Sequence, residues 1–374
     1  MYSVSLPDGT KLFVKIVPIK MWNYQWTQED QWEGEFTTDG ENFVMEAAAL
    51  AFLHEYAPGI APKLVAILEL SGAISPGSSK RSAASTRPGN IRRSDDTVTH
   101  IAIVSELYGE DLLDYLDRRD RRNKPLSEDE KHALQIGCVK LLRRLHDVGL
   151  AHLDFTPENI LVGHGGLRLC DFAKSTPLMS SKLRHVPVEI MGGSGAGVLE
   201  STILYEFESC EPTVGKGAYM PPECWSIYWR LETQRILRPL EDLKSLRSSA
   251  ERVSYYFKAS CADVYMAGVV LFWIWSDGGI WKCSDAKQDD KYYHLLKGDM
   301  NFDLFRECRA WPAALKSCLQ KTLTHEPWRR HTLPELLACS WIADFADPHA
   351  YLEVYSPRNP QREDPPQRNS RRPF

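Results

Sequence analysis

His152-Leu-Asp-Phe-Thr-Pro-Glu-Asn159 and Leu169-Cys-Asp-Phe-Ala173 are the two stretches of this sequence that decide its fold. Asp154 is suited to orient and deprotonate a hydroxyl group, and Asn159 and Asp171 offer the hard oxygen ligands that Mg²⁺ prefers. A lone aspartate usually belongs to a polar turn beside a buried strand, but the ordered set of His, Asp, Asn and Asp-Phe argues against that interpretation. The pattern predicts phosphoryl transfer from a metal-bound triphosphate.

The composition of the chain excludes several classes of protein. Its 374 residues are 43% hydrophobic and 25% charged, which is enough to bury a sizeable core in one large domain or two lobes. Forty-five basic and 50 acidic residues give a net charge of −5, which argues against nucleic-acid binding through bulk charge. The longest apolar run, Val264 to Trp275, is too short to span a bilayer and predicts a buried helix.

Targeting and redox signals are few. Lys11 and Lys15 interrupt the first apolar stretch after Met1, so no signal peptide is expected. The nine cysteines are odd in number and contain no CxxC pair. This argues against zinc ribbons and disulfide scaffolds and predicts a reducing compartment.

The region before residue 107 has an α+β pattern. Thr38 and Glu41 form a capping-box pattern at the start of a helix that ends at Tyr56, before Pro58-Gly59. Apolar runs rich in β-branched residues predict the strands. The expected elements are two strands within residues 4–16 joined at a Pro-Asp-Gly turn, a helix over 41–56, and strands over 63–70 and 97–106.

The rest of the chain is mostly helical, apart from two polar segments. Ser127 and Glu130 predict the capped start of a long helix whose apolar residues recur at helical spacing. Residues 71–96 are rich in Ser, Gly and Arg, and residues 356–374 contain five prolines and five arginines. These compositions predict a flexible insertion and a disordered tail.

The ordered motifs resemble the eukaryotic protein-kinase family, and within it the FIKK kinases of apicomplexan parasites. The narrower likeness rests on Phe13-Val-Lys-Ile16 with a following Trp22, on residues 35–55, and on Gly215-Lys-Gly-Ala-Tyr-Met-Pro-Pro-Glu-Cys-Trp225. It covers about residues 1–350 without the insertion. The resemblance implies one two-lobed kinase domain over 1–350, with a strand-rich N-lobe to about 107 that has one main helix, and a helical C-lobe over 108–350.

The resemblance also implies an activity. It predicts Mg²⁺- and ATP-dependent phosphorylation of Ser/Thr residues in protein substrates by a monomeric domain, without nucleic-acid binding or a membrane span. FIKK domains stand at the C-terminal end of longer chains that are often exported into the host cell. The residues it assigns to the nucleotide site are a strand lysine, its helix partner, two hinge residues and two further pocket residues: Lys15, Glu46, Glu106, Tyr108, Asp111 and Leu161.

Two motifs late in the chain favour a protein kinase over a small-molecule phosphotransferase. Tyr219-Met-Pro-Pro-Glu223 resembles the end of an activation segment, and Arg330 is expected to form a buried, structural pair with Glu223. Asp263 with Gly268 resembles the start of the central helix of the large lobe.

Several departures from the family pattern leave a pseudokinase as the alternative. No GxGxxG precedes Lys15, although FIKK kinases also lack this loop. The glycine-rich run 192–197 is expected to be a flexible part of the activation segment. Ala173 replaces a glycine, which restricts the backbone there. Leu153 replaces the arginine that binds an activation-loop phosphate, so activity should not depend on such a phosphorylation.

Two further departures look reciprocal. Ser/Thr kinases carry a lysine two residues after the catalytic aspartate and a threonine before the Pro-Glu motif, whereas this chain has Thr156 and Lys216 at these positions. We expect Lys216 to supply the cation at the transferred phosphoryl group, and Thr156 to hydrogen-bond to Asp154. Both are therefore counted with Lys15 and Asp154 as catalytic candidates.

Other residues near the expected cleft suggest its selectivity. Asp111 and Glu158 match positions that face a substrate arginine in basophilic kinases, which predicts a preference for basic Ser/Thr motifs. Ser105 occupies the position that gates the pocket behind adenine. Cys170 is expected to be a buried, inert thiol rather than a reactive one.

Overall fold

The computed structural model describes residues 2–27, 40–71, 98–180, 205–243, 246, 249–279 and 281–344. Ser71 is the last residue of a strand, and the rest of the expected insertion lies outside the described residues. The glycine run 192–197, residues 345–350 of the expected domain and the expected tail 356–374 also lie outside them.

A small lobe is built on one antiparallel sheet with the order β1-β2-β4-β3. Its strands are β1 (Tyr2–Ser5), β2 (Lys11–Pro18), β3 (Leu64–Ser71) and β4 (Val98–Glu106). Gly9 has a φ of +86° at the β1–β2 turn, a conformation that favours glycine. The four predicted strands are confirmed, and register pairs Lys15 on β2 with Ile103 on β4.

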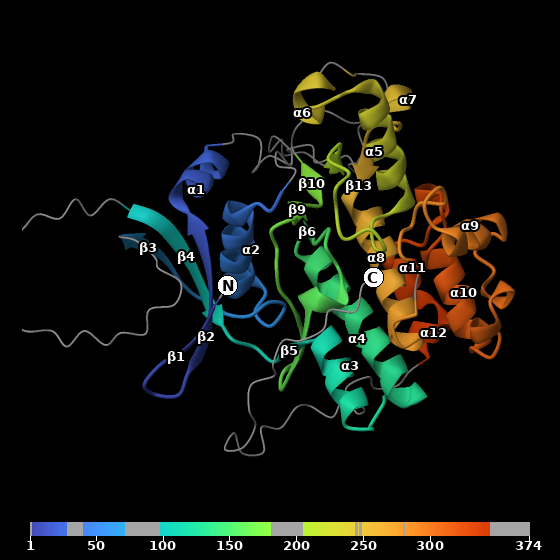
Figure 1. Ribbon diagram of the computed structural model, residues 1–374, viewed down its shortest axis with the longest axis horizontal. Helices are drawn as coiled ribbons and strands as arrows, with labels where there is room; N and C mark the ends of the chain where they lie inside the picture. Colours follow the sequence, from blue (N-terminus) through green and yellow to red (C-terminus); the bar gives the residue numbers. More distant parts are fainter. Residues whose placement is uncertain are drawn as a thin grey trace, which may run out of the picture.

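Two helices accompany this sheet (Figure 1). Helix α1 (Ile19–Trp26) continues directly from β2 and was not predicted. Helix α2 (Phe43–Tyr56) is capped by Asn42, whose side chain accepts a hydrogen bond from the Met45 N–H at 2.9 Å. The expected start at Glu41 with Thr38 as the cap is therefore wrong; Thr38 itself lies outside the described residues. Asn is as good an N-cap as Thr, and tertiary hydrogen bonds hold Asn42 at this position, since its N–H donates to the Ala173 carbonyl at 2.9 Å.

The large lobe is helical, which confirms the predicted α+β, two-lobed arrangement (Figure 1). Helix α4 (Glu128–Asp147) begins with the predicted capping box of Ser127 and Glu130. Helix α8 (Ala259–Trp275) is buried over nearly its whole length, as expected for a central core helix. Among the residues described, no helix combines the length and apolar character needed to cross a membrane.

Shorter elements surround α4 and α8. The remaining α-helices are α3 (Leu112–Arg121), α5 (Pro222–Gln234), α6 (Pro239–Asp242), α7 (Ser249–Arg252), α9 (Asp290–Lys297), α10 (Ala313–Thr322), α11 (Leu333–Ala338) and α12 (Ser340–Ala343). The short strands are β5 (Glu110–Asp111), β6 (Leu150–Ala151), β7 (Ile160–Gly163), β8 (Gly166–Leu169), β9 (Thr176–Pro177), β10 (Met179–Ser180), β11 (Tyr205–Glu206), β12 (Glu208–Ser209) and β13 (Phe257–Lys258). Strands β5, β7 and β8 form one sheet, which carries the loops of the site at its ends.

Candidate active site

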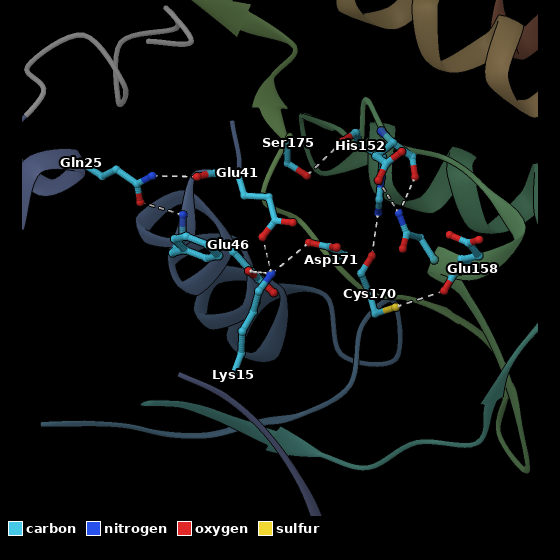
Figure 2. A network of polar contacts seen from close by, with 12 residues as sticks. Lys15, Gln25, Glu41, Glu46, His152, Glu158, Cys170, Asp171 and Ser175 are labelled. Carbon is cyan, nitrogen blue, oxygen red and sulfur yellow. Dashed lines mark hydrogen bonds and ion pairs between the residues drawn. The ribbon is translucent and has the colours of Figure 1, made fainter. Parts of the chain in front are cut away.

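Lys15 is the centre of a cluster of carboxylates between the two lobes (Figure 2). Its Nζ lies 2.7 Å from Glu46 Oε2 on α2, 3.3 Å from Asp171 Oδ1 and 3.2 Å from Glu41 Oε2. The structure therefore brings the predicted pair of Lys15 and Glu46 together and adds Asp171. Glu41 was not predicted as a site residue. The one signal in the sequence was that it is one of several acidic residues just before the helix that carries Glu46.

The charges in this cluster stabilise one another. Burial acts to lower the pKa of Lys15, but Glu46, Asp171 and Glu41 outweigh it, so the pKa is raised and the ammonium stays protonated. Burial raises the pKa of Glu46, while the Lys15 ammonium opposes this effect. Because the two groups are only 2.7 Å apart, we take the pair to be ionised.

Asp154 and Asn159 form the second part of the site, at the start of β7. Asn159 Nδ2 donates to Asp154 Oδ2 at 2.7 Å and to the Asp154 carbonyl at 2.9 Å. Asp154 Oδ1 is buried and has no hydrogen-bond partner among the described residues. Burial raises the pKa of Asp154, and His152, Asn159 and Lys216 act to lower it. A buried carboxylate oxygen without a donor is costly, so this atom is suited to receive one from a ligand.

Asp263, near the start of α8, fixes the backbone of the loop that carries Asp154. Its carboxylate, fully buried, accepts the backbone N–H groups of His152 and Leu153, both at 2.7 Å. His146 Nε2 lies 2.9 Å from the same carboxylate. Leu153 is buried with a φ of +58°. The two hydrogen bonds to a charged acceptor offset the strain of that conformation and fix the position of Asp154.

His152 connects the loop to the Asp-Phe-Ala segment. Its Nε2 lies 3.1 Å from the Cys170 carbonyl, and the Asp154 N–H lies 3.3 Å from its Nδ1. The Phe172 ring packs on the imidazole with ring centroids 5.1 Å apart. These contacts place Asp171 opposite Lys15, with a φ of +61°.

The donor set of Asn159 and Asp171 fits Mg²⁺. Both Nδ2 hydrogen bonds of Asn159 are directed to Asp154, which leaves its Oδ1 as a possible ligand, and the Asp171 carboxylate is one-third exposed, at 33%. Hard oxygen ligands of this kind, few in number, are typical of Mg²⁺ sites completed by phosphate oxygens and water. The described residues contain no cluster of three or more His, Cys, Asp or Glu side chains that would form an all-protein metal site.

The side chains of the hinge residues contact strand β8 and the residue before it. Tyr108 is buried; its hydroxyl donates to the Gly166 carbonyl and accepts the Gly165 N–H, both at 2.9 Å. Arg168 stacks on the Tyr108 ring and donates to Glu106 Oε2 at 2.7 Å. Adenine contacts through Glu106 and Tyr108 would use their backbone groups, and they stay a prediction.

Asp111 and Leu161 lie opposite each other on paired strands. The register of β5 and β7 pairs these two residues directly. Asp111 Oδ1 caps α3 by accepting the Asp114 N–H at 2.7 Å, and burial raises the pKa of Asp111. The capping role of Asp111 was not predicted, and a ribose contact would have to use its other carboxylate oxygen.

Lys216 lies beside the catalytic loop, as expected, but its partner is different. Its ammonium forms an ion pair with Glu158, and both side chains are about half exposed. Burial lowers the pKa of Lys216, and the charges of Asp154 and Asp111 act to raise it. The expected hydrogen bond from Thr156 to Asp154 is absent: Thr156 Oγ1 is buried without a partner among the described residues.

The predicted structural pair of Glu223 and Arg330 is confirmed. Arg330 Nη1 and Nη2 donate to the two carboxylate oxygens of Glu223 at 2.7 and 2.9 Å. The Arg330 side chain is 0% exposed. The pair anchors the start of α5, directly after the segment that carries Lys216.

Comparisons with known proteins found several protein kinases similar to this chain. No family model matches the chain. It is 25% identical to the serine/threonine-protein kinase HAL5 of Saccharomyces cerevisiae over 56% of this chain and 21% of that protein. It is 29% identical to the 3-phosphoinositide-dependent protein kinase 1 of Arabidopsis thaliana over 34% of this chain and 22% of that protein. The chain thus spans only about a fifth of the length of these curated relatives.

These relatives are serine/threonine protein kinases of the general superfamily and give no support to the narrower FIKK likeness. Another, the probable serine/threonine-protein kinase KKQ8 of Candida glabrata, is 32% identical over 34% of this chain and 16% of its own length. Taken with the two-lobed fold, these relatives support the protein-kinase superfamily for this chain.

Proposed function

We propose that this chain transfers the γ-phosphoryl group of Mg·ATP to serine and threonine hydroxyl groups of proteins, as a FIKK-type kinase without a glycine-rich loop. The observation that carries the proposal is Asp154: Oδ2 is held by Asn159, while Oδ1 is buried without a partner among the described residues. A substrate hydroxyl would provide the missing donor. The FIKK type is supported by sequence motifs alone: those around Lys15 and Lys216 and the stretch 35–55.

Each side chain of the site has a separate role in the proposed phosphoryl transfer. Asp154 orients the hydroxyl and accepts its proton as the new O–P bond forms and the bond to ADP breaks. Lys15 binds the α- and β-phosphates, with Glu46 fixing its direction. Asn159 and Asp171 would hold Mg²⁺, which neutralises charge on the phosphate oxygens.

Lys216 is proposed as the cation next to the transferred phosphoryl group. Its charge acts on Asp154, and its partner Glu158 belongs to the same loop. The single change Lys216→Thr should lower kcat strongly, because one cation at the developing charge is lost. The double exchange Thr156→Lys with Lys216→Thr should recover much of it. A single variant with near-wild-type kcat, or a double variant no better than the single, would refute this role.

The ion pair also changes the expectation for substrate choice. A substrate arginine would have to displace Lys216 from Glu158, so the basic preference should be weak in the wild-type protein. In the Lys216→Thr variant Glu158 is released, and the preference for arginine should increase. A peptide array compares the two proteins, and Glu158→Ala is the control that should abolish the gain.

A radiolabelled-ATP assay on a mixed peptide array tests the activity itself. The wild-type protein should label Ser/Thr peptides, and Asp154→Asn should lose turnover while it keeps nucleotide affinity. Nucleotide binding without any transfer in the wild-type protein would favour the pseudokinase alternative. Wild-type turnover in Asp154→Asn would refute the assignment of the catalytic loop.

A further inference from the structure

Helix α1 buries an amide rather than an apolar side chain. Of its eight residues, all of which the structure describes, Gln25 is the one that is buried, at 3% exposure. Trp22 is half-buried and stacks on Trp26 with ring centroids 6.3 Å apart. An amphipathic helix normally directs apolar residues inward, so a buried glutamine at this position needs a specific partner.

The amide of Gln25 binds the chain on both sides of Asn42, the cap of α2 (Figure 2). Its Nε2 donates to the Glu41 carbonyl at 2.7 Å, and its Oε1 accepts the Phe43 N–H at 2.9 Å. Phe43 opens α2, where backbone N–H groups have no partner within the helix. Gln25 satisfies one of them, and the two hydrogen bonds fix the direction of its side chain.

The segment held in this way touches both halves of the active site. The Glu41 carboxylate lies 3.2 Å from Lys15 Nζ, and the Phe43 ring centroid lies 5.0 Å from the same atom. The Asn42 N–H donates to the Ala173 carbonyl at 2.9 Å. Three consecutive residues therefore bind α1, the Lys15 cluster and the Asp-Phe-Ala segment at once.

From these contacts we infer that Gln25 is a positioning residue for phosphoryl transfer. It holds the first turn of α2 so that Glu46 meets Lys15 and Ala173 stays bound to Asn42. The inference rests on the proposed kinase activity. Because α1 follows β2 without a break, the strand that carries Lys15 and the amide that fixes α2 belong to one continuous segment. Outward movement of α2 would break both Gln25 hydrogen bonds.

The simpler alternative is that Gln25 only adds stability, and the chain offers a matched control. Gln135 on α4 is fully buried and also makes one donated and one accepted hydrogen bond. Its Nε2 donates to the Leu271 carbonyl at 2.6 Å, and its Oε1 accepts the Trp341 indole N–H at 2.8 Å. Gln25→Met and Gln135→Met therefore remove the same chemistry from the small and the large lobe.

Three measurements separate the two roles. In Gln25→Met, deuterium exchange of the amides in residues 43–46 should become at least about tenfold faster, since two hydrogen bonds are lost. An amine-directed reagent should modify Lys15 faster, because Glu41 and Glu46 withdraw from its ammonium and leave it more accessible. The value of kcat/KM for a peptide should fall at least about tenfold. Gln135→Met should lower the unfolding midpoint and change none of the three.

Gln25→Glu is the second variant, in case Gln25→Met does not fold. It keeps the acceptor for the Phe43 N–H and loses the donor to the Glu41 carbonyl, so its exchange rate should be intermediate. Unchanged exchange and Lys15 labelling in both Gln25 variants, or the same changes in Gln135→Met, would overturn the inference. If the wild-type protein transfers no phosphate, the proposed function fails, while exchange and labelling still decide the role of Gln25.

Discussion

The Arg330→Met variant should unfold far more easily than the Arg329→Met variant. Arg330 makes two charge-assisted hydrogen bonds to Glu223, at 2.7 and 2.9 Å, and a third to the Cys261 carbonyl at 2.9 Å. The Glu223 side chain is only 11% exposed, so methionine leaves a buried carboxylate without its cation. Removing one partner of such a pair costs about 3–5 kcal/mol.

Urea unfolding followed by fluorescence measures this loss, since the chain has 11 tryptophans. With a slope of about 3 kcal/mol per molar, the midpoint should fall by about 1 M or more. Arg329→Met is the control: Arg329 is 57% exposed and 3.5 Å from Glu326, a surface pair that contributes about 0–1 kcal/mol. Adding Glu223→Gln to Arg330→Met should restore about 1–2 kcal/mol of the free energy of unfolding, because the buried, unpaired carboxylate is then removed. Equal midpoints for the two single variants would refute the reasoning.

Three further predictions concern the cleft and the thiols. Ser105 is buried on β4. Ser105→Met should lower the affinity for bulky inhibitors about tenfold, or by about 1.4 kcal/mol, and leave the KM for ATP unchanged. Equal inhibition of the two proteins would contradict the gatekeeper role. Cys170 is half-buried rather than fully buried as expected, and burial raises the pKa of its thiol, whereas a hydrogen bond with the Cys318 thiol lowers the pKa of Cys339. Iodoacetamide should therefore modify Cys339 before Cys170, as followed by mass spectrometry. The reverse order would contradict the two pKa shifts. Because burial raises the pKa of Asp154, the activity lost on acidification should be lost at a higher pH than the ordinary pKa of an aspartate would give. Lys216→Thr removes a charge that lowers the Asp154 pKa, so it should move the acidic side of the pH–activity profile to still higher pH. An unchanged profile would place Lys216 away from Asp154.

Much of the fold follows from local patterns. The strands before residue 107 were predicted because β-branched apolar runs between turn residues specify them locally. The start of α4 was predicted because the capping box of Ser127 and Glu130 is complete within four residues. Helix α1 was missed because its eight residues are fewer than the window of about 11–18 residues over which a helical period is recognised. Asn42 replaced Thr38 as the cap of α2 because two acceptable caps lay within one turn of each other, and propensity does not choose between them.

The sequence by itself determined two ion pairs of this protein and gave a prediction for the chemistry of its site. Lys15 and Arg330 were each assigned the carboxylate that the structure places beside them. The order and spacing of Asp154, Asn159 and Asp171 predict a base and two hard oxygen ligands, and these roles stay predictions. These assignments rest on residue types in a fixed order.

Only the tertiary structure decided which groups share the remaining contacts. Lys216 pairs with Glu158, while Thr156 is buried without the hydrogen bond expected to Asp154. Gln25 bonds to residues 41 and 43, across a stretch of chain that no periodic pattern connects to it. A side chain of several rotatable bonds can reach many partners, and the fold decides which of them lies within its reach. That selection depends on distances between elements far apart in the chain, so local sequence cannot specify it.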